Sequence, residues 1–113
     1  MAHSPQFEAL CEAARARITE VSVPQATTGR WTLVDIREDH EWERGHIPGA
    51  EHLGRGILER DALKRWQLDS PLALYCGGGY RSALAAESLQ KMGFTQVVSV
   101  AGGYKAWKRL QDA

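Results

Sequence analysis

Short apolar runs alternate along this chain with segments in which apolar residues recur at helical spacing. The apolar runs predict buried strands at residues 32–36, 72–76 and 97–100, and an alternation of apolar and polar residues predicts another at 18–23. A further, brief strand is expected at 51–53. Helical spacing predicts helices at residues 7–14, 39–44, 57–66, 81–92 and 104–110. Strands that alternate with helices are typical of the α/β class, with a parallel sheet that helices cover on both faces.

Proline, glycine and capping residues mark the ends of these predicted elements. Pro24 is expected to end the strand at 18–23, and a polar connector follows it. Asp39 is expected to cap the helix at 39–44, and Gly93 to follow the helix at 81–92. The helix at 7–14 would bury a stripe formed by its apolar side chains, which are Phe7, Leu10, Cys11 and Ala14.

The composition indicates an ordinary globular protein. A length of 113 residues and a mass of 12.5 kDa fit one domain, residues 1–113, with residues 1–17 as an N-terminal helical extension. Fourteen basic and fourteen acidic residues balance, so the sequence has no electrostatic footprint for nucleic acid or for an anionic membrane. No secretory signal and no run of about 18 apolar residues is evident, which favours the cytoplasm.

The chain has two cysteines, Cys11 and Cys76, which are too few for a disulfide framework and do not form a zinc-binding pair. Cys11 lies on the apolar stripe of the first helix and is expected to be a buried, inert thiol. His40, His46 and His52 lack a metal-binding spacing, so no metal and no other cofactor is predicted.

The segment 72–84, LALYCGGGYRSAL, carries the strongest functional signal. It predicts that Cys76 ends a strand, at the sheet edge where α/β proteins bind ligands. The amides of Gly77, Gly78 and Gly79, the N-terminus of the next helix and the cation of Arg81 would together favour the thiolate form of the cysteine. The alternative without a function is that Cys76 is a small buried side chain followed by a flexible glycine turn. The combination of strand, cysteine, glycines, arginine and helix favours a functional cysteine.

Three motifs in this order resemble the rhodanese family of sulfurtransferases, and its single-domain form in particular. They are LVDIREDHEWERGHIPGA at 33–50, CGGGYRS at 76–82 and VAGGYKAW at 100–107. The resemblance implies five parallel strands flanked by helices on both faces. It also implies that Cys76 takes a sulfane sulfur from thiosulfate or a persulfide donor, and passes it to cyanide, a small thiol or a sulfur-relay protein.

The same resemblance implies roles for the loop residues. Gly77, Gly78, Gly79 and Tyr80 would supply amides, and Arg81 would hold an anion. Tyr80 is equally well explained as a wall of the pocket that influences the acceptor or as a plain exposed aromatic ring.

Two other functions remain open on the same architecture. Tyrosine and dual-specificity phosphatases use a related loop with one more residue between cysteine and arginine than the four found here, so phosphatase or arsenate-reductase chemistry is the less favoured alternative. A catalytically silent protein-binding module is the other alternative, and the presence of Cys76 and Arg81 argues against it.

The remaining polar candidates are expected to be structural. Asp35 and Arg37 follow the strand at 32–36 and would support the site or tie loops together, with Glu41 as a partner of Arg37. The charged run 37–44 is expected to be a solvated helix face, and His46 a structural part of a turn. Gly102 and Gly103 are expected to form a tight turn beneath the Cys76 loop, and four tryptophans to be core or partly buried anchors, namely Trp31, Trp42, Trp66 and Trp107.

Overall fold

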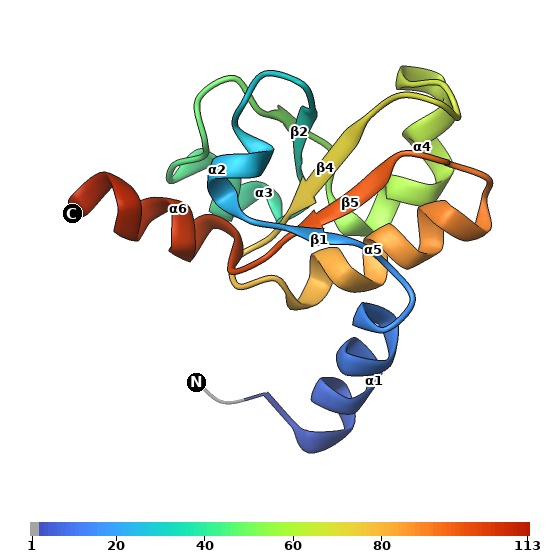
Figure 1. The fold of residues 1–113 in the computed structure, drawn as a ribbon, viewed down its shortest axis with the longest axis horizontal. Helices are drawn as coiled ribbons and strands as arrows, with labels where there is room; N and C mark the ends of the chain where they lie inside the picture. Colours follow the sequence, from blue (N-terminus) through green and yellow to red (C-terminus); the bar gives the residue numbers. More distant parts are fainter. Residues whose placement is uncertain (1–2) are drawn as a thin grey trace.

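Five parallel strands form one sheet in the order β1-β5-β4-β2-β3 (Figure 1). The computed structural model describes residues 3–113. The strands are β1 (Glu20–Val21), β2 (Thr32–Asp35), β3 (Glu51–His52), β4 (Leu72–Tyr75) and β5 (Val97–Val100). The predicted five-stranded parallel sheet is therefore confirmed, although its two edge strands, β1 and β3, are only two residues long.

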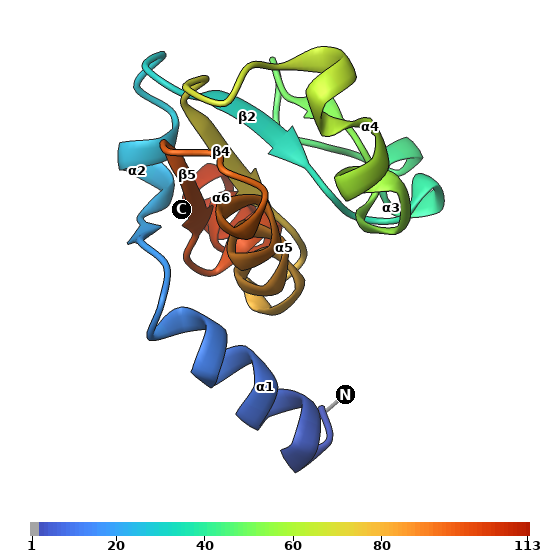
Figure 2. The same cartoon turned by 90° about the vertical axis from the view of Figure 1, so that its right-hand side faces the viewer.

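Helices cover both faces of this sheet, as predicted (Figure 2). The helical elements are α1 (Pro5–Arg15), α2 (Val23–Ala26), α3 (Asp39–Glu43), the 3-10 turn η1 (Arg55–Ile57), α4 (Leu58–Arg65), α5 (Tyr80–Lys91) and α6 (Gly103–Asp112). Side chains alternate along a strand, so Leu72 and Leu74 of β4 pack with α4 and α5, and Tyr75 packs on the opposite face with α2 and α6.

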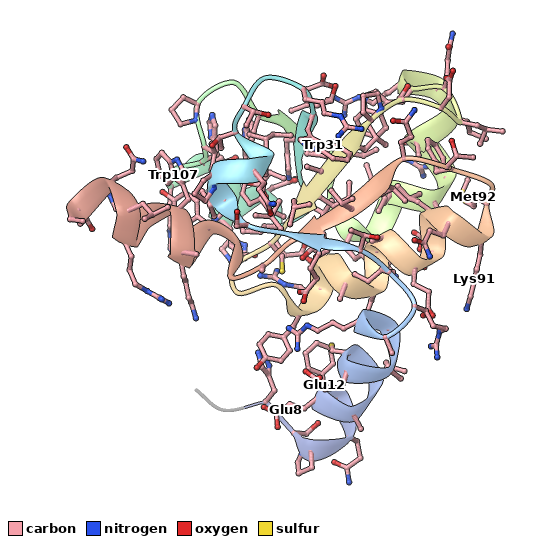
Figure 3. All side chains as sticks on the ribbon, in the orientation of Figure 1. Glu8, Glu12, Trp31, Lys91, Met92 and Trp107 are labelled. Carbon is pink, nitrogen blue, oxygen red and sulfur yellow. The ribbon has the colours of Figure 1, made fainter. Side chains whose placement is uncertain are left out.

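The four tryptophans are partly buried, as the sequence predicts. Trp31 and Trp107 pack against the core on the α2–α6 side of the sheet (Figure 3). Trp66 packs against the core on the α4–α5 side.

Helix α1 lies against α5, on the side of α5 that faces away from the sheet (Figure 1 and Figure 2). Its Cys11 and Ala14 are fully buried, and burial raises the pKa of the Cys11 thiol. Leu10 was expected on the buried stripe, but 57% of its surface is exposed. Met1 and Ala2, the first residues of the predicted extension, lie outside the described residues. Within residues 3–113, no helix is both long and apolar enough to span a membrane.

The sequence-based boundaries are wrong around Pro24. Pro24 does not end a strand: it lies in the first turn of α2, where a proline costs no hydrogen bond. Ser22 and Gln25 form a reciprocal capping box, in which the Gln25 amide donates to the Ser22 hydroxyl at 3.2 Å and the Ser22 amide donates to Gln25 Oε1 at 2.8 Å. The Ser-x-x-Gln spacing is a sequence signal for the start of a helix, and it was overlooked at the junction of the predicted strand and connector.

Helix α3 also begins differently from the prediction. Asp39 is its first residue, and Glu38 occupies the capping position that the sequence assigned to Asp39. The Glu38 amide donates to the carboxylate of Glu41 at 3.1 Å, which closes the first turn.

Asp35 and Arg37 form a buried ion pair that joins β2 to two other segments. Their Oδ2 and Nη2 atoms are 2.8 Å apart, and Nη2 also donates to the Gly45 carbonyl at 2.6 Å. The guanidinium lies 4.3 Å from the ring centre of Tyr104 in α6. The pair ties loops together, as expected, but Arg37 is not on a solvated face and its partner is Asp35 rather than Glu41.

We expect Asp35→Asn to lower the free energy of unfolding by about 3–5 kcal/mol, because it leaves a buried guanidinium without its counter-charge. Asp61→Asn is the control, since Asp61 pairs at the same 2.8 Å with Arg60, whose side chain is exposed. Urea denaturation should detect a loss of at most about 1 kcal/mol for Asp61→Asn. Equal losses in the two variants would contradict the structural role of the buried pair.

Candidate active site around Cys76

Cys76 lies directly after β4, at the carboxyl edge of the sheet, as the sequence predicts. In the parallel register Asp35 of β2 stands opposite Tyr75 of β4, so these two strands end together. Cys76 is only 1% exposed, and the glycine loop that follows it leads straight into α5.

The sulfur of Cys76 accepts hydrogen bonds at the N-terminus of α5. The amides of Gly79 and Ser82 donate to Sγ at 3.2 and 3.3 Å. Gly79 is the capping residue of α5 with φ +94°, and Ser82 is the third helical residue, so the sulfur takes the place that a capping oxygen usually has. The helix dipole and two amides therefore stabilise negative charge on Sγ.

A pair of buried hydroxyls extends this contact. The Ser82 hydroxyl oxygen is 3.5 Å from Sγ and 2.8 Å from the hydroxyl oxygen of Ser99 in β5, and both serines are fully buried. When Ser99 donates to Ser82, the Ser82 proton is free to donate to an ionised sulfur. Sequence reasoning missed both serines, although Ser82 follows Arg81 within the CGGGYRS run and so had to lie in the first turn of the helix.

The N-terminus of α6 lies beneath the loop and binds its carbonyls. The amides of Tyr104 and Lys105 donate to the carbonyls of Cys76 and Gly77 at 2.8 and 3.0 Å. The N–H and C=O groups of a trans peptide point in opposite directions, so the amides of Gly77 and Gly78 point away from α6. Within residues 3–113 neither amide has a protein acceptor, and both glycines line the pocket described below.

Gly103 makes this contact possible, which agrees with the predicted Gly102–Gly103 turn beneath the loop. Its φ is +55°, and a Cβ atom at this position would lie only 2.3 Å from the carbonyl oxygen of Cys76. Any larger residue would push the loop off α6.

Gly103→Ala should therefore be far more destabilising than the control Gly49→Ala. Gly49 also has a positive φ, +86°, but a Cβ there meets nothing within 4 Å. We expect about 1–2 kcal/mol for Gly49→Ala, from backbone strain alone, and a clearly larger loss for Gly103→Ala in the same urea titration. Similar losses would show that the loop does not depend on its close approach to α6.

A pocket of about 510 Å³ opens beside Cys76. Its lining residues come from the loop, the start of α5, α3, α6 and the start of α1, and they are His3, Ser4, Phe7, Glu41, Cys76, Gly77, Gly78, Tyr80, Arg81 and Lys105. Asp35 and Arg37, expected as supporting site residues, are not among them. The N-terminal residues were missed because no sequence motif links them to the loop. Lys105 was missed although it lies in the VAGGYKAW run, just after the turn predicted beneath the loop.

Arg81 is paired with a carboxylate rather than free. Its Nη1 and Nη2 atoms donate to the two oxygens of Glu41 at 2.8 and 3.2 Å. The hydrogen bond from Arg81 lowers the pKa of Glu41 to about 2. Glu41 thus offsets the positive charge of Arg81, which the sequence analysis assigned to anion binding. Glu41 was predicted to pair with Arg37, but it pairs with Arg81 instead.

The pairing predicts a pH-dependent effect of Glu41→Gln. The folded-state pKa of Glu41 is depressed from 4.5 to about 2, so the pair stabilises the fold fully above pH 4.5 and this contribution is lost as the pH falls towards 2. At neutral pH the variant should lose at most about 1 kcal/mol, because the pair is partly solvated.

The melting temperatures of the two proteins should converge as the pH falls from 4.5 towards 2. At neutral pH the released Arg81 should raise the affinity of the pocket for an anionic ligand by roughly threefold. A gap in melting temperature that persists at the lowest pH would contradict the assigned pair.

The histidines near this edge have structural contacts. The rings of His46 and Trp42 stack with centroids 3.4 Å apart, and His46 Nδ1 lies 3.0 Å from the Trp42 carbonyl oxygen. In the described part of the chain, no three His, Cys, Asp or Glu side chains are grouped as a metal site would require.

Known proteins resemble this chain in sequence and in fold. The family model of the rhodanese-like domain matches residues 19–110. The thiosulfate sulfurtransferase GlpE of Stutzerimonas stutzeri is 40% identical over 76 residues, which cover 67% of this chain and 69% of that protein. The uncharacterized protein YqhL of Bacillus subtilis is 39% identical over 75 residues, and the chain spans only 59% of its length.

Solved structures give the same fold. A protein of unknown function from Rhodopseudomonas palustris, described as a possible tyrosine phosphatase, superposes with a TM-score of 0.78 at 29% identity. The match covers 98% of this chain and 96% of that one, so it includes the segment around α1.

Proposed function

Because the chain belongs to the family of rhodanese-like domains, we propose that it is a sulfurtransferase in which Cys76 carries the transferred sulfur as a persulfide. The observation that carries this proposal is the set of polar groups on one sulfur: two amides donate to Sγ, and the Ser82 hydroxyl lies 3.5 Å from it, beside an open pocket. Such a sulfur is stabilised as an anion, which is the form that attacks and the form that leaves.

With thiosulfate as donor, the Cys76 thiolate attacks the outer, sulfane sulfur. A bond forms between Sγ and that sulfur, the bond to the sulfonate sulfur breaks, and its electron pair leaves with sulfite. In the second step cyanide or a thiolate attacks the outer sulfur of the persulfide. The Sγ–S bond then breaks, its electron pair returns to Sγ, and thiocyanate or an organic persulfide departs.

The loop residues have proposed roles in both steps. The amides of Gly77 and Gly78 point away from α6 and would hold the charge of the outer sulfur, together with those of Gly79 and Tyr80. Arg81, whose guanidinium packs close to Gly77, would orient an anionic donor. A thiol that cycles through a persulfide fits a reducing compartment such as the cytoplasm.

Intact mass spectrometry after incubation with thiosulfate tests this proposal. We expect the protein to gain the mass of one sulfur atom, and cyanide to remove it as thiocyanate. Cys76→Ser should gain nothing, whereas Cys11→Ser should behave like the parent chain because Cys11 is buried between α1 and α5.

Two results would contradict the proposal. The first is no adduct together with hydrolysis of an aryl phosphate that depends on Cys76, which would indicate phosphatase chemistry. The second is neither adduct nor hydrolysis, which would leave the silent binding module as the function of this fold.

A further inference from the structure

The pocket beside Cys76 is larger than a small inorganic donor or acceptor requires. Its volume of about 510 Å³ lies within the range of about 300–1,000 Å³ that is typical of organic ligands. Three of its lining residues, His3, Ser4 and Phe7, precede the residues 19–110 that match the family model. One wall of the pocket therefore comes from a segment outside the family's common domain.

This wall is aromatic. The ring centroids of His3 and Tyr80 are 4.4 Å apart, those of His3 and Phe7 are 5.0 Å apart, and those of Phe7 and Tyr80 are 6.2 Å apart. These separations are typical of interacting aromatic rings. Tyr80 belongs to the start of α5, so the cluster joins the loop of Cys76 to the N-terminal segment.

Several contacts fix α1 in this position. Arg15 Nη2 donates to the Gly79 carbonyl at 3.3 Å, and its guanidinium lies 4.6 Å from the ring centre of Tyr80. Arg17 forms an ion pair with Glu87 of α5. At the other end of the helix, the Phe7 amide donates to the Ser4 hydroxyl at 3.1 Å. The contacts of Arg15 and Arg17 thus hold the C-terminal end of α1 against α5 and the loop, and the Ser4 cap fixes the first turn of the helix that carries Phe7.

We propose that His3, Phe7 and Tyr80 form a subsite that binds the aromatic or bulky apolar group of an organic thiol acceptor. The inference rests on the proposed sulfurtransferase function and names the acceptor class. The acceptor thiolate attacks the outer sulfur of the Cys76 persulfide, the Sγ–S bond breaks with its electron pair returning to Sγ, and the acceptor leaves as an organic persulfide. The rings contact the organic group next to the attacking sulfur and hold it in line.

The test measures sulfur transfer from the preformed Cys76 persulfide to three acceptors, which are phenylmethanethiol, 2-mercaptoethanol and cyanide. The unmodified chain should transfer to phenylmethanethiol faster than to 2-mercaptoethanol. Phe7→Ala should slow transfer to phenylmethanethiol by roughly threefold to tenfold. It should slow transfer to 2-mercaptoethanol and to cyanide far less, because these acceptors carry no aromatic group for the rings to bind.

Two further variants separate the subsite from a general effect on α1. Leu10→Ala removes an apolar side chain of similar size from the same helix, but Leu10 is 57% exposed and does not line the pocket, so all three rates should stay unchanged. Phe7→Tyr keeps the ring and should keep the preference for the aromatic thiol. A melting curve for each variant shows whether α1 remains folded on α5.

The outcomes are distinguishable. Equal slowing with all three acceptors, or no change with any of them, overturns the subsite while the proposed function stands. Failure of the unmodified chain to form a persulfide, which intact mass reveals before any acceptor is added, overturns the proposed function and the subsite with it.

Discussion

The candidate site depends on two glycine turns that meet backbone against backbone at the carboxyl edge of the sheet. The carbonyls of Cys76 and Gly77 are held by the first amides of α6, and Gly103 has no room for a side chain beneath them. Because these two carbonyls face α6, the amides of Gly77 and Gly78 face the opposite way, towards the pocket. The close approach of these two turns thus determines which side of the loop faces the pocket.

Backbone groups, more than charged side chains, make this site favourable for an anion. Arg81, the evident cation, gives both Nη atoms to Glu41, whereas the amides of Gly79 and Ser82 address the sulfur directly. Fixed amide dipoles need no reorganisation when charge moves between the sulfur and a bound substrate. The rings of His3, Phe7 and Tyr80 lie beside this sulfur, in the same pocket.

The fold around Cys76 could be predicted from the sequence, because the residues that form its strand, turn and helix follow one another directly along the chain. The run from Leu72 to Leu84 contains a strand, a turn and a helix in order, and this order alone places Cys76 at a helix N-terminus. The pairing of Arg81 with Glu41 could not be predicted, since it joins residues 40 positions apart. The place of Phe7 against Tyr80 likewise depends on how α1 docks, and no local pattern encodes that docking.

The most direct test of the central claim is a crystal structure determined after treatment with thiosulfate. The account predicts one additional sulfur atom bonded to Sγ of Cys76, lying in the pocket within hydrogen-bonding distance of the Gly77 and Gly78 amides, with the loop carbonyls still bound to α6. An unmodified Cys76, or an added sulfur that points away from those amides, would contradict it.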